Sequence, residues 1–309
     1  MSDPAIEAHD LSKTFPGGVV AVNGLDLAVP RDCVYGLIGR NGAGKTTAIR
    51  MLMGLLRPNR GTARLLGADM WTAPREQRAR VAYVSQAQQV HGWMTPEELC
   101  HYASHFYERW DGPYARDLAE RFGIPWQTQV GLLSGGEQRK AAILLAFAAR
   151  PEVLLLDEPA AGLDPIARRE LIDEIIDVLS RAEGCAVLFS THIISDLERI
   201  AEYVGIMDRG RIVTSARLED LQSHTKRVQV ILGDTLPPGF KLPVIPGTIR
   251  STVEGPVVTA VVRMDTESQL DEIRRIPGVR VNVFPVGLEE IFIELFGRGA
   301  RGEFMEESL

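Results

Sequence analysis

The sequence is poor in cysteine, and the few cysteines form no pattern. Only Cys33, Cys100 and Cys185 occur among 309 residues, and their spacing matches neither a zinc site nor a disulfide framework. A metal site at Cys100 with the nearby His101 and His105 would lack a fourth ligand. We therefore expect a chain that works in a reducing compartment.

Basic charge is also scarce. The formal net charge is −7 and the pI is about 5.5. The phosphate backbone of DNA or RNA favours proteins with a basic face. The charge balance therefore argues against a nucleic-acid partner.

Long apolar runs are missing as well. The alanine-rich stretch "AAILLAFAA" at 141–149 is far shorter than a membrane-spanning helix, which needs about 20 apolar residues. The first ten residues, "MSDPAIEAHD", lack the basic patch and apolar run of a secretory signal. We expect a cytoplasmic chain that reaches a membrane only through a partner.

Strand and helix patterns alternate as far as about residue 220. Short, continuous apolar runs suit the strands of a parallel sheet that is covered on both faces. Such runs are "CVYGLI" at 33–38, "VLLL" at 153–156 and "AVLFS" at 186–190. The region 87–150 is expected to be helical, with Thr95 as a helix cap and Pro96 in the first turn. These patterns predict an α/β fold with a small helical lobe.

The pattern changes after residue 222. A proline- and glycine-rich stretch at 234–247 interrupts a segment that is rich in strand candidates. The candidate strands are "VQVIL", "VVTAVVRM" and "VRVNVF", and the candidate helices are "ESQLDEIRRI" and "LEEIFIELF". We expect a first domain over 1–222 and a small α+β accessory domain over 223–309, in which no chemistry is identified.

A phosphate-binding loop follows the first predicted buried strand. The stretch "GRNGAGKTT" at 39–47 fits the pattern G-x-x-x-x-G-K-[ST]. Glycines let successive N–H groups wrap phosphates, while a lysine reaches the β- and γ-phosphates and a hydroxyl binds Mg²⁺. The expected nucleotide-binding residues are Gly39, Asn41, Gly42, Gly44, Lys45, Thr46 and Thr47, with Thr46 also on the metal.

A second phosphate-reading element is present about ninety residues later. Ser134, Gly135 and Gly136 open the apolar helix in "LLSGGEQRKAAILLAFAAR". A helix start without bulky side chains presents bare N–H groups to an anion. The chain therefore carries two phosphate-reading elements, and one bound nucleotide does not explain both.

Acidic and polar side chains follow three of the predicted strands. In "VLLLDEP", Asp157 is a candidate Mg²⁺ ligand, and Glu158 is the candidate to polarise the attacking water. Gln86 follows "VAYVS" and His192 follows "FST". The carboxyl ends of parallel strands share one edge of a sheet, so these side chains could face the phosphate loop.

Phosphate loop, Gln86, "LSGGEQ", "LLLDEP", "GLD" and "STH" occur in this order. Over about residues 5–220 the chain resembles the ATPase subunit of an ATP-binding cassette (ABC) transporter. The resemblance implies two nucleotide domains packed head to tail, so that the signature helix of one caps the ATP held by the other. Ser134, Gly135 and Gly136 would then read the γ-phosphate on the partner, which accounts for the second anion-binding helix start.

The resemblance also implies a role for each motif residue. Asp157 corresponds to the aspartate on the magnesium side and Glu158 to the catalytic glutamate. Gln86 corresponds to the glutamine that senses Mg²⁺ and the membrane subunit, and His192 to the histidine that contacts the γ-phosphate. Asp164 corresponds to the aspartate that communicates across the dimer.

Phe15 stands where a tyrosine usually stacks on adenine in that family, and stacking needs only the aromatic face. Two stretches depart from the common pattern. Ala161 and Gly162 in "AAGLDP" replace the more common Ser or Thr and Ala, and the approach to the signature, "QTQVGLLSGG" at 127–136, is also not the common form. Neither departure removes a catalytic group, so we expect hydrolysis to be retained, and cross-dimer signalling is the property they affect.

The resemblance favours a Mg²⁺-dependent ATPase that powers export through a separate integral membrane permease. The helical lobe is short, and "GLEEIFIELFG" at 287–297 resembles the end of bacterial export ATPases. The second ATPase would be an identical or a related chain, and the segment 87–98 would line a groove for the permease. The alternatives are an importer ATPase, whose tail is usually a β-barrel, and a soluble cassette protein that acts on ribosomes or DNA.

Overall fold

The structure, a computed structural model, describes residues 3–86, 90–180, 184–233 and 243–296. The chain divides into two compact units, residues 1–215 and 216–309. The division falls before the change of pattern at residue 222, because α8 (Leu218–His224) packs on a strand of the second unit.

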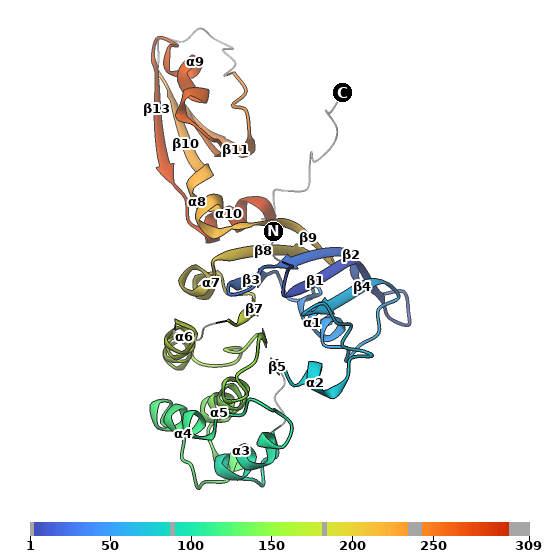
Figure 1. The fold of residues 1–309 in the computed structure, drawn as a ribbon. Coiled ribbons are helices and arrows are strands. Elements are labelled where there is room, and N and C mark those ends of the chain that lie inside the picture. Colours follow the sequence, from blue (N-terminus) through green and yellow to red (C-terminus); the bar gives the residue numbers. More distant parts are fainter. Residues whose placement is uncertain (1–2, 87–89, 181–183, 234–242, 297–309) are drawn as a thin grey trace. The chain divides into compact units, whose positions relative to one another are not determined.

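The first unit contains two sheets (Figure 1). One is antiparallel in the order β2-β1-β4, formed by β1 (Ile6–Thr14), β2 (Val20–Val29) and β4 (Arg60–Leu65). The other has the order β5-β6-β7-β3-β8-β9, formed by β3 (Val34–Ile38), β5 (Val81–Val84), β6 (Val153–Asp157), β7 (Ala186–Thr191), β8 (Tyr203–Asp208) and β9 (Arg211–Arg217).

The three predicted buried strands lie side by side in this second sheet. They form β6, β7 and β3, and the pairs β6·β7 and β3·β7 are parallel. All five residues of β6 are buried, as the continuous apolar run predicts. The expected α/β fold is confirmed, and the carboxyl ends of these strands meet at one edge.

Four helices connect the strands of the first unit: α1 (Lys45–Leu52), α2 (Arg75–Arg78), α6 (Pro165–Ser180) and α7 (Ile194–Ile200). A helical lobe consists of α3 (Pro96–Ser104), α4 (Gly112–Arg121), the short 3₁₀ turn η1 (Val130–Leu132) and α5 (Gly135–Ala148). Figure 1 shows α3, α4 and α5 packed together, and all three pairs are in contact.

The predicted start of the first lobe helix is confirmed. Thr95 Oγ1 accepts a hydrogen bond from Glu98 N at 3.2 Å, and Glu98 Oε2 accepts one from Thr95 N at 2.8 Å. This reciprocal capping box satisfies two N–H groups that a helix start leaves free. Part of the segment 87–98, which we expected to line a groove, lies outside the described residues at 87–89.

The second unit is a four-stranded antiparallel sheet in the order β11-β12-β10-β13. It comprises β10 (Thr225–Leu232), β11 (Thr248–Glu254), β12 (Val257–Arg263), η2 (Glu267–Leu270), α9 (Asp271–Arg274), β13 (Val279–Pro285) and α10 (Leu288–Phe296). Each of the five predicted elements is present. Its core contains Val228, Val230, Val262, Leu270 and Ile273.

Candidate nucleotide site

The phosphate loop has a backbone that only glycine accommodates at two positions. At Gly44, φ is +106°, and an added Cβ would collide with the carbonyl oxygen of Ala21. At Gly39, an added Cβ would lie 2.6 Å from the carbonyl oxygen of Met207. Gly42 has φ of +83° and faces open space. These positions explain why the loop takes this residue pattern between β3 and α1.

Lys45, the first residue of α1, meets residues from two other strand ends. Its Nζ donates to the carbonyl oxygen of Gly39 at 2.7 Å and lies 3.1 Å from Glu158 Oε1. Glu158 Oε2 lies 2.7 Å from His192 Nδ1. Lys45 and Glu158 are only 5% and 4% exposed. A buried carboxylate is therefore shared between the lysine of the phosphate loop and the histidine that follows β7.

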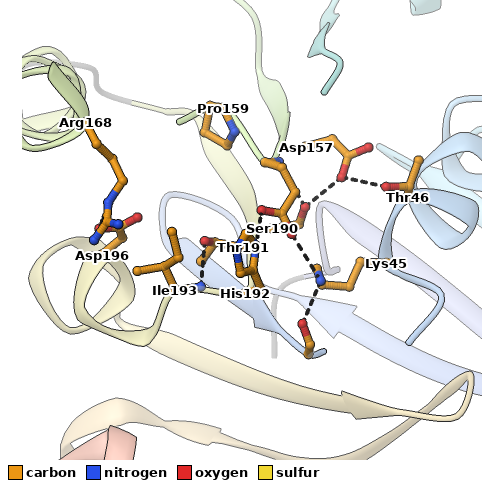
Figure 2. Close-up of polar contacts among 12 residues, drawn as sticks. Lys45, Thr46, Asp157, Pro159, Arg168, Ser190, Thr191, His192, Ile193 and Asp196 are labelled. Carbon is orange, nitrogen blue, oxygen red and sulfur yellow. Dashed lines mark hydrogen bonds and ion pairs between the residues drawn. The ribbon is translucent and has the colours of Figure 1, made fainter. Parts of the chain in front are cut away.

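Asp157 forms a second polar centre beside the first. Its Oδ1 accepts hydrogen bonds from Thr46 Oγ1 at 3.1 Å and from Ser190 Oγ at 2.8 Å, as Figure 2 shows. Its Oδ2 lies 3.4 Å from the Tyr83 hydroxyl on β5. The Asp157 side chain is thus held by groups from α1, β7 and β5.

The backbone of Glu158 is strained and held in place. Its φ is +52°, a left-handed conformation that a residue with a long side chain adopts only when its surroundings enforce it. Glu158 N donates to the Ser190 carbonyl oxygen at 3.0 Å, and Arg139 Nη1 on α5 donates to the carbonyl oxygens of Glu158 and Pro159, both at 3.2 Å. Burial lowers the pKa of Arg139. These contacts fix the direction in which the Glu158 carboxylate points.

The predicted second phosphate-reading element is an exposed helix start. Ser134 Oγ accepts from Glu137 N at 3.3 Å, and Glu137 Oε2 accepts from Ser134 N at 2.8 Å. The hydrogen bond from Ser134 lowers the pKa of Glu137. An added Cβ at Gly135 would meet no atom within 4 Å. The contacts of Ser134 lie within its own helix, which leaves this glycine face of α5 open.

Three predicted site residues lie outside the cluster around Lys45. Gln86 is exposed in the bend after β5. Phe15 follows β1, is 37% exposed and has Lys13 Nζ 5.7 Å from its ring centroid. Asp164 caps α6, since its Oδ1 accepts hydrogen bonds from two backbone N–H groups in the first turn of that helix, at 3.0 and 3.1 Å. Among the described contacts, none joins these three side chains to Lys45.

Three residues that hold the site together are not predicted from the sequence. Ser190 and Tyr83 both contact Asp157, and Arg139 supports Glu158. A signal existed for Ser190, because a polar residue inside an otherwise apolar strand needs a buried partner. Tyr83 and Arg139 gave no such signal, since tyrosine and arginine are ordinary in a strand and on a helix.

A cavity of about 490 Å³ lies in the lobe region, against the strand that carries Tyr83. Its lining is rich in aromatic side chains: Tyr83, His91, Tyr102, Phe106 and Tyr107. Tyr102 and Phe106 are about half exposed. The ring of Tyr83 therefore faces this cavity while its hydroxyl reaches Asp157.

The polar groups of the site fit a nucleoside triphosphate with Mg²⁺. Thr46 and Asp157 place a hydroxyl and a carboxylate side by side, and hard oxygen ligands of this kind suit Mg²⁺. Within the described residues, no group of three or more His, Cys, Asp or Glu side chains could hold a metal alone. Mg²⁺ in nucleotide sites is usually held by one or two carboxylates together with phosphate oxygens and water.

No helix in the described parts of the chain is both long and apolar enough to span a bilayer.

Comparison with known proteins agrees with this geometry. The sequence model of the family described as "ABC transporter" matches residues 22–161. The chain is 36% identical over 225 residues to the daunorubicin/doxorubicin resistance ATP-binding protein DrrA of Streptomyces peucetius, covering 71% of this chain and 67% of that one. It is 30% identical over 317 residues to the Nod factor export ATP-binding protein I of Ralstonia nicotianae, covering 97% and 96%.

A solved structure supports the same assignment. The ATP-binding subunit of an ABC transporter superposes with a TM-score of 0.63 at 28% identity, over 71% of this chain and 92% of that one. The chain therefore belongs to the ATP-binding proteins of the ABC transporter family, and it is an ATP-binding ATPase by that membership.

Proposed function

We propose that this protein hydrolyses ATP to power export through a separate integral membrane permease. The observation that carries the proposal is that Lys45 and His192, from two distant segments, both contact the buried carboxylate of Glu158. A buried cluster of ionisable groups at the edge of a parallel sheet is typical of a catalytic centre.

Each residue has its own role in hydrolysis. When ATP binds, Lys45 leaves Glu158 and pairs with the β- and γ-phosphates. The backbone N–H groups of the phosphate loop donate hydrogen bonds to the same phosphates. Glu158 then accepts a proton from the attacking water. The water oxygen bonds to the γ-phosphorus as the bond to the β–γ bridging oxygen breaks, which yields ADP and phosphate. His192 contacts the γ-phosphate.

The proposed active state contains a second ATPase chain. The open helix start at Ser134, Gly135 and Gly136 of each chain would contact the γ-phosphate held by the other. Asp164 communicates across the same interface, and Phe15 stacks on adenine. ATP binding closes the dimer and hydrolysis reopens it. An identical partner chain suits this proposal, since each chain carries a full set of groups.

We assign the metal in this site as Mg²⁺, held by Thr46 and Asp157 with Gln86 at the edge of the site. When bound, Mg²⁺ neutralises charge that builds up on the phosphate oxygens. Adding EDTA to the purified protein is expected to reduce phosphate release to the background rate, and excess MgCl₂ to restore it. Hydrolysis that continues unchanged in EDTA would contradict the metal assignment.

Relatives support the direction of transport. One similar protein is named for drug resistance and another for Nod factor export. An importer ATPase is the alternative, but the described part of the second unit is a four-stranded sheet in the order β11-β12-β10-β13 with helices α8, α9 and α10, rather than the β-barrel tail expected for importers. We treat the region 223–309 as an accessory domain and place the protein on the cytoplasmic face of the membrane, held there by the permease.

The permease is expected to dock between Gln86 and the helical lobe, on the side of the lobe that holds the aromatic cavity. Affinity purification of the tagged protein from detergent-solubilised host membranes, followed by mass spectrometry, tests this. We expect a stoichiometric polytopic membrane protein to copurify. Phe106→Asp should abolish the copurification without lowering ATP hydrolysis. Val253→Asp, which also replaces an exposed apolar residue but in the second unit, should leave it intact.

Each outcome of this purification has a distinct meaning. Recovery of ribosomal or DNA-associated proteins alone, with hydrolysis intact, would favour the soluble cassette function and contradict transport. A substrate-binding protein that copurifies with the membrane subunit would favour an importer. Loss of the membrane protein with Val253→Asp but not with Phe106→Asp would move the docking surface to the second unit.

A further inference from the structure

Two ion pairs join helices α6 and α7, and they differ in burial. Arg168 Nε donates to Asp196 Oδ1 at 3.2 Å, and the Asp196 side chain is 8% exposed. Arg199 pairs with Asp173, and both of these side chains are more than a third exposed. Exposed pairs contribute little to stability. Both pairs therefore join an arginine to an aspartate, and they differ in how far they are exposed to solvent.

The buried pair connects two segments of the proposed site. Arg168 lies one turn into α6, where its backbone N–H donates to the carbonyl oxygen of Asp164 at 2.9 Å. Asp196 lies in the first turn of α7, four residues after His192. Figure 2 shows the Arg168 side chain reaching Asp196. A change in the position of Asp164 would thus reach the segment of His192 through Arg168 and its buried partner.

The α7 end of this contact is fixed on the sheet. Leu197 is fully buried next to Asp196, and its Cδ2 lies where a Cβ on Gly36 of β3 would be only 2.7 Å away. Between β7 and α7, Ile193 N donates to Thr191 Oγ1 at 3.0 Å. Because α7 is packed this closely on β3, the pair with Arg168 sets the position of α6 relative to a rigid support.

Stability does not account for a charge buried at Asp196. Burial raises the pKa of Asp196, while Arg168, Arg199 and His192 act in the opposite direction. Buried ion pairs are often no more stabilising than apolar residues of similar volume, and their best-documented use is to fix one arrangement among several. A fixed arrangement of α6 and α7 is what the His192 segment requires.

We propose that Arg168 and Asp196 form a positioning pair that holds His192 against Glu158 and makes this geometry depend on the segment that carries Asp164. The inference rests on the proposed ATP hydrolysis, in which His192 contacts the γ-phosphate. Neither member of the pair touches the substrate, and both act through His192.

The test combines Arg168→Met, Asp196→Asn and the double variant, each in the wild-type and the His192→Ala chain. The two single variants and the double variant should lower kcat about tenfold, with the KM for ATP unchanged. The double variant leaves no unpaired buried charge, so its unfolding temperature should return to that of the wild type while kcat stays low. In the His192→Ala chain, the double variant should cause no further loss. Asp173→Asn is the matched control and should keep wild-type kcat.

Two results would overturn the pair's role. One is a double variant in which kcat recovers together with the unfolding temperature, because the pair would then serve stability alone. The other is an equal loss of kcat in the His192→Ala chain, because the pair would not act through His192. A wild-type chain that fails to hydrolyse ATP would contradict the proposed function and the pair's role with it. Wild-type hydrolysis with fully active pair variants would contradict only the pair.

Discussion

Replacing Glu158 with glutamine is expected to lower the rate of ATP hydrolysis by roughly 10²–10⁴ while ATP binding is retained. The carboxamide cannot accept the proton of the attacking water, yet its oxygen can still accept a hydrogen bond from Lys45, the present partner of carboxylate Oε1. Loss of one negative charge beside the phosphates also favours ATP. Phosphate release and binding of a fluorescent ATP analogue measure the two properties separately.

The same variant is expected to accumulate as a closed dimer in the presence of ATP, because in the proposed cycle ATP binding closes the dimer and hydrolysis reopens it. Size-exclusion chromatography with ATP and with ADP shows this directly. Glu120→Gln makes the same chemical change on the exposed surface of α4 and should behave as wild type. If Glu158→Gln turns over ATP as fast as the wild type, the assignment of Glu158 as the base is wrong.

The sequence predicts the elements of the site better than their mutual contacts. Short apolar runs predict β3, β6 and β7, and all three occur as neighbouring parallel strands. The phosphate loop follows β3, and its glycines occupy positions where a Cβ would collide or φ is positive. These features are local, because they depend on hydrophobic periodicity and on the backbone freedom of single residues.

The contacts that hold the catalytic groups depend on strand order, which the sequence does not contain. Asp157 pairs in register with Ser190 because β6 and β7 are neighbours, and this places the serine hydroxyl 2.8 Å from the aspartate. The strain at Glu158 has the same origin, since Ser190 supplies the carbonyl oxygen that its N–H needs. Arg168 and Asp196 are 28 residues apart and meet only once α6 and α7 have packed.

The aromatic cavity also depends on packing that the sequence does not predict. Tyr102 in α3 and Phe106 just after it are ordinary core candidates, and the sequence gives no reason to expect a cavity of about 490 Å³ between them and β5. Its wall includes residues of β5, α3 and α5. Only the packing of these three elements brings Tyr102, Phe106 and Tyr83 around one space.

Replacing Lys45 with methionine is expected to lower ATP affinity by at least ~10², because a desolvated cation aimed at phosphate oxygens is lost. The change also has a cost in the protein without nucleotide. Glu158 is 4% exposed, and Lys45 is the cation paired with its carboxylate, which also lies within hydrogen-bond distance of His192. Removing one member of a buried pair costs on the order of 3 kcal/mol, which lowers the unfolding temperature by roughly 6–12 °C.

The double variant Lys45→Met with Glu158→Gln separates these two effects. With no charge left unpaired at Glu158, its unfolding temperature should rise back towards that of the wild type. ATP binding should stay as weak as in the single variant, since the phosphates still lack their cation. Thermal unfolding and analogue binding, measured on the same preparations, distinguish the loss of phosphate binding from the loss of stability. Recovery of ATP binding in the double variant would show that Lys45 supports the fold around Glu158 rather than the phosphates.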